Sequence, residues 1–325
     1  MIEVKNLTKR FGQKTALSGI SFSVKKGEVL GFLGPNGAGK STTMNILTGY
    51  LSPTAGMASV DGFDVLKEPN EVKKRIGYLP EIPPLYPEMT VEEYLDFVCD
   101  LKKVQKNKSA HIDELCRRTQ IAGVRHRLIK NLSRGYRQRV GLSGALAGDP
   151  DVLILDEPTV GLDPKQIKEI RGLIQTLGKT HTVILSSHIL PEVQAVCDRI
   201  VIINGGRIVA EGTTESLSSE LSPAPVYHAL IKGEAQAIRA ELIKLRGVKA
   251  VVVESRGQAA SLFSLEVEKG ADPREGLFDL LSANHWPLLE LKSNAMTLEE
   301  IFLKLTSENL EQDGRVKANG GEGEV

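Results

Sequence analysis

The sequence predicts two folded domains, an α/β domain followed by a smaller α+β domain, and three observations support this prediction. Short apolar runs alternate with segments of helical periodicity in the first two-thirds of the 325-residue chain. The last third instead follows the order β-α-β-β-α-β. Charge also changes sign near residue 215: residues 1–215 contain 29 Lys and Arg against 24 Asp and Glu, whereas residues 216–325 contain 12 against 17.

The α/β domain is expected over residues 1–215. Its predicted strands are nearly continuous apolar runs, which indicates a parallel sheet covered on both faces. These strands are Ile20–Val24, Val29–Leu33, Val152–Leu155, Val183–Leu185 and Arg199–Ile203. Helical periodicity marks Lys40–Thr48, Val91–Lys103, Ala110–Ile121, Val140–Ala147 and Pro164–Leu177. Because residues 88–148 contain almost no strand pattern, we expect a helical insertion there.

The second domain is expected over residues 223–308, with a ferredoxin-like arrangement. Its predicted elements are the strand Val226–Ile231, the helix Glu234–Leu245, the strands Val248–Val253 and Leu262–Val267, the helix Pro273–Ala283 and the strand Pro287–Leu291. A further helix, Leu298–Thr306, would follow Thr297, a suitable N-cap with Glu300 three residues on. Residues 216–222, in a Ser- and Pro-rich stretch, are expected to form a linker. Residues 309–325 are expected to form a disordered tail.

Composition and charge exclude several classes of protein. Lys and Arg total 41, equal to Asp and Glu, which argues against a nucleic-acid binder. The apolar runs are too short to cross a bilayer, and the first residues do not form a signal peptide. Cys99, Cys116 and Cys197 form no CxxC pair, so we expect reduced thiols in a cytosolic protein.

A glycine-rich loop carries the strongest functional signal. The pattern GxxxxGK[ST] is matched by Gly34, Pro35, Asn36, Gly37, Ala38, Gly39, Lys40 and Ser41, and Thr42 follows. The loop lies between a predicted strand and a predicted helix, which is the context that the motif requires. Backbone N–H groups and the helix N-terminus would bind phosphates, Lys40 would reach the β- and γ-phosphates, and Ser41 would ligate Mg²⁺. The sequence therefore predicts a nucleoside triphosphate site.

Two acidic residues follow the predicted strand Val152–Leu155. Asp156 would hold Mg²⁺ directly or through water, and Glu157 would act as the base that polarises an attacking water. A GTPase would need an NKxD motif, but the nearest string, Asn107-Lys108-Ser109-Ala110, lacks the aspartate. A small-molecule kinase would not explain the next motif.

The segment Leu132–Arg139 resembles the LSGGQ signature of ABC ATPases, with Ser133 and Gly135 kept but Arg134 and Tyr136 in place of Gly and Gln. Further family features match in order over residues 2–212. They are Phe11 as the aromatic residue that stacks on adenine, Glu81 at the place of the Q-loop glutamine, Asp163 in a D-loop-like Gly161-Leu162-Asp163, and His188 as the switch histidine. The resemblance implies a P-loop NTPase domain of the ABC ATPase type with a helical signature subdomain.

The resemblance also implies ATP and Mg²⁺ as cofactors and a head-to-tail sandwich of two ATPase subunits, as a homodimer or a heterodimer. The γ-phosphate on one subunit's loop would meet Ser133 and Gly135 of the other, while Lys40, Glu157 and His188 carry out hydrolysis. Asp163 would contribute to nucleotide binding. Glu81 would ligate Mg²⁺ or water, so Glu81→Gln is expected to retain activity.

Because the sequence shows no membrane segment, the resemblance implies an integral membrane permease on a separate chain, driven for export. The subunit is then expected to be cytoplasmic, peripheral on the inner face of the cell membrane, with no nucleic-acid partner. Two other interpretations stay open. A soluble ABC ATPase would act on ribosomes or DNA, although such relatives carry two ATPase domains or long coiled coils. Alternatively, the ferredoxin-like domain would sense a regulatory ligand or stabilise a dimer.

Overall fold

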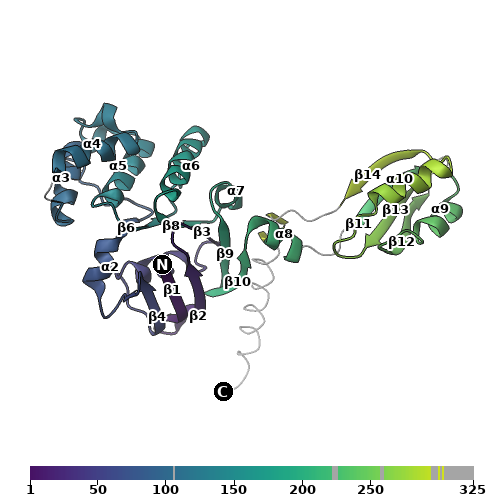
Figure 1. Ribbon diagram of the computed structural model, residues 1–325, viewed down its shortest axis with the longest axis horizontal. Helices are drawn as coiled ribbons and strands as arrows, with labels where there is room; N and C mark the ends of the chain where they lie inside the picture. Colours follow the sequence, from purple (N-terminus) through teal and green to yellow (C-terminus); the bar gives the residue numbers. More distant parts are fainter. Residues whose placement is uncertain (105–106, 222–225, 257–259, 294–298, 301, 304–325) are drawn as a thin grey trace, which may run out of the picture. The chain divides into compact units, whose positions relative to one another are not determined.

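The computed structural model describes residues 1–104, 107–221, 226–256, 260–293, 299–300 and 302–303. The chain divides into two compact units, one ending at Thr214 and the other beginning at Glu215 (Figure 1). Each unit has its own apolar core. Within the described ranges, no helix is both long enough and apolar enough to cross a membrane.

A six-stranded, mainly parallel sheet organises the first unit. In order across the sheet, its strands are β10 (Arg207–Gly212), β9 (Arg199–Asn204), β3 (Val29–Leu33), β8 (Thr182–Ser187), β7 (Val152–Asp156) and β6 (Ile76–Leu79). All pairs are parallel except β9 with β10. Every residue of β3 and β7 is buried, which confirms the predicted parallel sheet covered on both faces. Because parallel strands end at one edge, the loops after Leu33, Asp156 and Ser187 lie together.

A second sheet is antiparallel, with the strands β2 (Lys14–Val24), β1 (Ile2–Phe11), β4 (Ala55–Val60) and β5 (Phe63–Asp64) in that order. The assignment of Ile20–Val24 to a parallel sheet was wrong, because this strand is part of β2. Its buried Ile20, Phe22 and Val24 alternate with exposed residues, as in a strand with one covered face. Phe22 packs on Phe32 of β3, with ring centroids 5.3 Å apart, so the two sheets share a core.

The helical insertion contains α3 (Val91–Leu101), α4 (Lys108–Arg118) and α5 (Arg134–Leu146), which cluster beyond β6 in Figure 1. Their apolar faces share one core, and the described residues between 88 and 148 contain no strand. Thr90 and Glu93 form a capping box that starts α3. The remaining helices of this unit are α1 (Lys40–Leu47), α2 (Pro69–Arg75), α6 (Pro164–Gly178) and α7 (Leu190–Gln194).

Helix α5 begins six residues before the predicted start at Val140. Glycines in this helix had hidden its periodicity, since glycine is a poor helix former. Gly141 lies against Pro83, and Gly144 lies against Tyr94, so closely that an added Cβ would be 2.7 Å and 2.9 Å from those side chains. These glycines are therefore required by helix packing.

The second unit has the predicted ferredoxin-like topology. Its elements are β11 (Val226–Lys232), α9 (Ala235–Leu242), β12 (Val248–Arg256), β13 (Ala260–Val267), α10 (Arg274–Ala283) and β14 (Leu288–Ser293). The strands pair antiparallel in the order β12-β13-β11-β14, which is the order that the βαββαβ motif produces. Leu242, Phe263 and Leu277 are among the residues that form its core.

Most of the predicted linker is not an extended connection. Residues 216–221 belong to the helix α8 (Thr214–Leu221). Its serines, leucines and glutamate are compatible with a helix, and the helix-breaking prolines come only at 223 and 225. The predicted tail 309–325 lies outside the described residues, as do Thr297 and most of the predicted helix Leu298–Thr306.

Candidate nucleotide-binding site

The glycine-rich loop joins β3 to α1 at the carboxyl edge of the six-stranded sheet. Gly37 and Gly39 have φ angles of 78° and 113°, which favour glycine. A Cβ on Gly39 would lie 2.6 Å from Leu17 Cδ2 and 2.9 Å from the Ala16 carbonyl oxygen. Gly39 also caps α1 without a side-chain hydrogen bond. The N–H groups of the first turn of α1 are therefore free of a side-chain cap and suited to bind an anion.

Lys40 is held beneath this loop. Its side chain is only 5% exposed, and Nζ donates to the carbonyl oxygens of Gly34 at 2.8 Å and Pro35 at 3.2 Å. Nζ also lies 3.3 Å from Oε1 of Glu157, in a buried ion pair. The loop and the acidic end of β7 are thus joined through one ammonium group.

Glu157 follows β7 in a left-handed backbone conformation, with φ of 48°. Its N–H donates to the Ser186 carbonyl oxygen at 3.2 Å and to Ser186 Oγ at 2.9 Å. Ser186 Oγ in turn donates to Oδ1 of the buried Asp156. Ser186 of β8 therefore links both predicted acidic residues.

The carboxylate of Glu157 has two different oxygen environments. Oε2 lies 2.9 Å from Nδ1 of His188, which follows β8. Oε1 is buried and accepts no hydrogen bond from the described residues, although Lys40 is near. A buried carboxylate oxygen without a donor is costly unless a ligand or water supplies one. Oε1 therefore has the unused acceptor capacity that a general base needs.

A cavity of about 560 Å³ opens over these groups. It is lined by Phe11, Lys14, Ala16, Asn36, Gly37, Gly39, Lys40, Ser41, Thr42, Glu81, Glu157, Val160 and His188. The structure thus brings together ten predicted site residues from five chain segments. Lys14, Ala16 and Val160 were not predicted as site residues, but Lys14 pairs with Phe11 across the turn between β1 and β2. Recognising a two-residue turn after Phe11 in the sequence would have placed Lys14 opposite Phe11.

Phe11 is 49% exposed at the rim of this cavity, and Lys9 Nζ lies 5.0 Å from its ring centroid. An exposed aromatic face at a cavity rim is suited to stacking on a purine. Glu81, which also lines the cavity, is exposed to solvent after β6. Its carboxylate oxygens are hard acceptors of the kind that Mg²⁺ prefers.

The predicted residues Ser133, Gly135 and Asp163 do not line this cavity. Ser133 caps α5 by accepting from the Tyr136 N–H at 3.4 Å, and Asp163 caps α6 by accepting from the Gln166 N–H at 2.9 Å. The two caps lie side by side, because a Cβ on Gly135 would be 2.7 Å from Cδ of Gln166. The signature and D-loop segments therefore form a second polar surface of the same unit.

Arg134 strengthens this connection. Its guanidinium rests on the backbone of Gly161, where an added Cβ would lie 2.3 Å from Arg134 Cζ. Gly161 also has a φ of 68°, a backbone conformation that favours glycine. The arginine that departs from the family signature thus packs directly on the D-loop.

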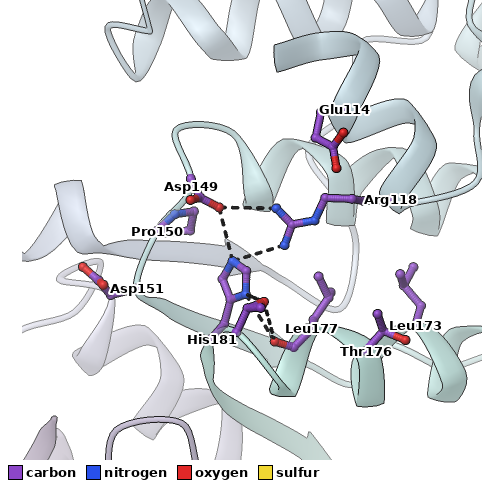
Figure 2. Close-up of a pocket in the computed structure, with 10 residues that line it drawn as sticks. Glu114, Arg118, Asp149, Pro150, Asp151, Leu173, Thr176, Leu177 and His181 are labelled. Carbon is purple, nitrogen blue, oxygen red and sulfur yellow. Dashed lines mark hydrogen bonds and ion pairs between the residues drawn. The ribbon is translucent and has the colours of Figure 1, made fainter. Parts of the chain in front are cut away.

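A separate cavity of about 370 Å³ lies between α4, α6 and the loop before β7 (Figure 2), and none of the predicted site residues lines it. Arg118 lies 3.3 Å from Asp149 and 3.4 Å from Nε2 of His181. Nε2 of His181 also lies 3.5 Å from Asp149 Oδ1, and Nδ1 faces the Leu177 carbonyl oxygen at 3.2 Å and Thr180 Oγ1 at 2.7 Å. Burial, together with the positive charge of Arg118, lowers the pKa of His181. His181, which is neutral above this lowered pKa, thus connects α4, α6 and the loop before β7.

Comparisons with known proteins show the family to which this chain belongs. The family described as "ABC transporter" matches residues 17–160. The linearmycin resistance ATP-binding protein LnrL of Bacillus subtilis is 35% identical over 315 residues, spanning 95% of this chain and 99% of that protein. The daunorubicin/doxorubicin resistance ATP-binding protein DrrA of Streptomyces peucetius is 34% identical over 309 residues, spanning 94% and 92%.

Solved structures show the same relationship. An ATP-binding subunit of an ABC transporter superposes with a TM-score of 0.61 and 30% identity, covering 68% of this chain and 92% of that chain. A dimeric structure of the ATP-binding cassette MJ0796, in a post-hydrolysis state bound to ADP and Pi, gives 0.60 and 26%, covering 66% and 98%. The chain therefore belongs to the ATP-binding proteins of ABC transporters. It is an ATP-binding, ATP-hydrolysing transport subunit, and the soluble alternative is not favoured.

Proposed function

We propose that two copies of this ATPase, or one copy and a related chain, enclose two ATP molecules and drive export through a separate membrane permease. The observation that carries this proposal is the division of the predicted site between two surfaces. Lys40, Glu157 and His188 meet at one cavity, whereas Ser133 and Asp163 are exposed outside it. A head-to-tail pair of units would bring the second surface of one unit to the cavity of the other.

Each cavity residue then has a definite task. The loop from Gly34 to Gly39 would cradle the phosphates with its N–H groups, with Pro35 and Ala38 shaping its turn. Lys40 would reach the β- and γ-phosphates, Thr42 would contribute to nucleotide binding, and Phe11 would stack on adenine. Charge-assisted hydrogen bonds from an ammonium to phosphate oxygens are among the stronger polar contacts in proteins.

Ser41, Asp156 and Glu81 are the residues that would hold Mg²⁺. A hydroxyl, a buried carboxylate and an exposed carboxylate are the oxygen donors that this ion accepts, and Mg²⁺ usually takes only one or two protein carboxylates. When bound, the ion would neutralise charge on the β- and γ-phosphates. The modest number of protein donors therefore fits a metal that is shared with a nucleotide.

Hydrolysis would depend on Glu157 and His188. Oε1 of Glu157 accepts a proton from the attacking water, while Oε2 stays bonded to His188 Nδ1 at 2.9 Å. Ser133 Oγ and the Gly135 N–H of the second unit would contact the γ-phosphate. Loss of that phosphate would remove the group that joins the two units, so the dimer would loosen after each turnover.

The permease would dock beside α3. Ile82 is 81% exposed and Tyr86 is 48% exposed in the segment between β6 and α3, which also contains Pro83 and Pro84. Exposed apolar side chains on a proline-stiffened loop are typical of a protein contact. This partner would hold the ATPase on the inner face of the cell membrane. The names of relatives that refer to linearmycin resistance and to daunorubicin/doxorubicin resistance support a small-molecule drug as cargo.

Light scattering of Glu157→Gln with and without Mg-ATP tests the two-site arrangement. The variant keeps the nucleotide contacts but lacks the base, so an ATP-dependent shift from monomer to dimer is expected. Lys40→Met, in the same background, is the control that should stay monomeric. A Glu157→Gln chain that binds ATP yet stays monomeric, both alone and with its co-purified permease, would contradict the proposal.

A further inference from the structure

Glu192 on α7 is a buried carboxylate to which the functions above assign no role. It is 6% exposed, and within the described ranges no lysine, arginine or histidine forms an ion pair with it. Burying a carboxylate is costly unless hydrogen bonds compensate it. An apolar side chain would fill the same space without that cost, so the contacts of Glu192 indicate what it does.

Two hydroxyl groups donate to one oxygen of this carboxylate. Thr159 Oγ1 donates to Glu192 Oε2, and Ser187 Oγ donates to the same atom at 3.4 Å. Thr159 and Ser187 are themselves buried. The Ile189 N–H donates to Ser187 Oγ at 3.0 Å, which fixes the backbone on the far side of His188.

These contacts join the two chain segments that carry the proposed base and switch histidine. Thr159 lies two residues after Glu157, and Ser187 lies immediately before His188. Glu192 thus spans the gap between the loop after β7 and the loop after β8. The hydrogen bond between Glu157 Oε2 and His188 Nδ1 lies between the same two segments.

The backbone of Glu157 needs such support. A non-glycine residue with a φ of 48° is strained, and the surrounding structure must hold it in place. On the N-terminal side, Ser186 fixes the Glu157 N–H through its carbonyl oxygen and Oγ. On the C-terminal side, the bond from Thr159 to Glu192 fixes the following residues.

We propose that Glu192 is a positioning residue that holds Glu157 and His188 in register for ATP hydrolysis. It acts through those two residues and does not touch the nucleotide. The proposal rests on the roles assigned to Glu157 and His188 above. Misplacing a reacting group by about 1 Å costs about 100-fold in rate, so loss of this clamp should lower kcat more than it changes ATP binding.

The test compares Glu192→Leu and Glu192→Gln in the full-length chain, measuring kcat, KM and the dissociation constant for Mg-ATP. Glu192→Leu removes both hydrogen bonds and should lower kcat by about 10- to 100-fold with ATP affinity nearly unchanged. Glu192→Gln keeps an acceptor for Thr159 and should recover part of that loss. Thr119→Val is the matched control, since Thr119 is buried but donates only to the Leu115 carbonyl oxygen within α4.

A second comparison separates positioning from general destabilisation. In the Glu157→Gln background, Glu192→Leu should cause a much smaller further loss of kcat, because one of the two groups that it positions is already gone. An equal further loss there, or kcat and ATP affinity falling together, would overturn the proposal. If Glu157→Gln itself hydrolyses ATP at the wild-type rate, the proposed role of Glu157 fails. If Glu192→Leu hydrolyses ATP at the wild-type rate but Glu157→Gln does not, only the inference about Glu192 fails.

Discussion

The nucleotide cavity and the signature surface of the same unit differ in how their polar groups are satisfied. Lys40 and Glu157 are buried and form an ion pair, and the buried Asp156 accepts a hydrogen bond from Ser186 Oγ. Ser133, Arg134 and Asp163 are exposed, and the bonds recorded for Ser133 and Asp163 only cap their own helices. The polar groups of the nucleotide cavity are thus paired within one chain, whereas the signature surface presents spare donors and acceptors to solvent. This difference is what a site shared between two chains requires.

Mixing two inactive variants would test that division most strongly. Lys40→Met destroys the cavity, and Ser133→Arg blocks the signature surface, so each chain alone should lose about 100-fold or more in ATP hydrolysis. A one-to-one mixture should recover up to about a quarter of wild-type activity, since half of the dimers would hold one intact composite site. A chain that carries both Lys40→Met and Ser133→Arg, assayed alone, is the control. No recovery from proven mixed dimers would refute composite sites.

The contact between Arg134 and Gly161 sharpens the comparison within the signature surface. Gly161→Ala should lower stability by about 1–3 kcal/mol, because a φ of 68° is strained for alanine and its Cβ would strike the guanidinium. Arg134→Gly removes the clash but not the backbone strain, so the double variant should regain part of the loss. Urea unfolding measures both the loss of stability in Gly161→Ala and its partial recovery in the double variant. Gly172→Ala, at a glycine with open space around it, is the matched control.

Phe11 probes the rim of the cavity. Phe11→Ala should raise KM for ATP by about 3- to 10-fold, since stacking of aromatic groups contributes about 0.5–1.5 kcal/mol. Because the chemistry lies deeper, kcat should stay near the wild-type value, and Phe11→Tyr should behave like wild type. A change in kcat without a change in KM would show that Phe11 does not act through adenine.

The smallest expected effect concerns pH and the junction in Figure 2. Burial and Arg118 lower the pKa of His181 below its ordinary value of about 6.5. The unfolded chain therefore binds the proton more readily, and this contribution to stability is complete above that value and is lost as pH falls below it. His181→Gln should reduce the difference in unfolding free energy between pH 7.5 and pH 5. An unchanged difference would assign that pH dependence to the other groups around the cavity, Glu114, Asp149 and Asp151.

The parallel strands and the phosphate loop could be predicted because their signals are local. Val152–Leu155 is apolar throughout, and the loop motif fixes both residue type and spacing. The antiparallel sheet was missed, apart from Ile20–Val24, because β1 contains many polar residues on its solvent-facing side. The start of α5 was missed because glycines chosen for close packing lower helix propensity. Glu192 could not be found from sequence, since its partners lie 33 and 5 residues away and meet only at the sheet edge.

The bonds of Lys40 have a consequence for anion selectivity. An incoming anion must compete with two backbone carbonyl oxygens and the Glu157 carboxylate for the same ammonium. A small ion such as sulfate or free phosphate offers fewer charges and acceptor oxygens for that exchange than a triphosphate does. A triphosphate attached to a base and a sugar brings many at once. The ion pair between Lys40 and Glu157 should therefore favour a polyphosphate over a small anion at this position.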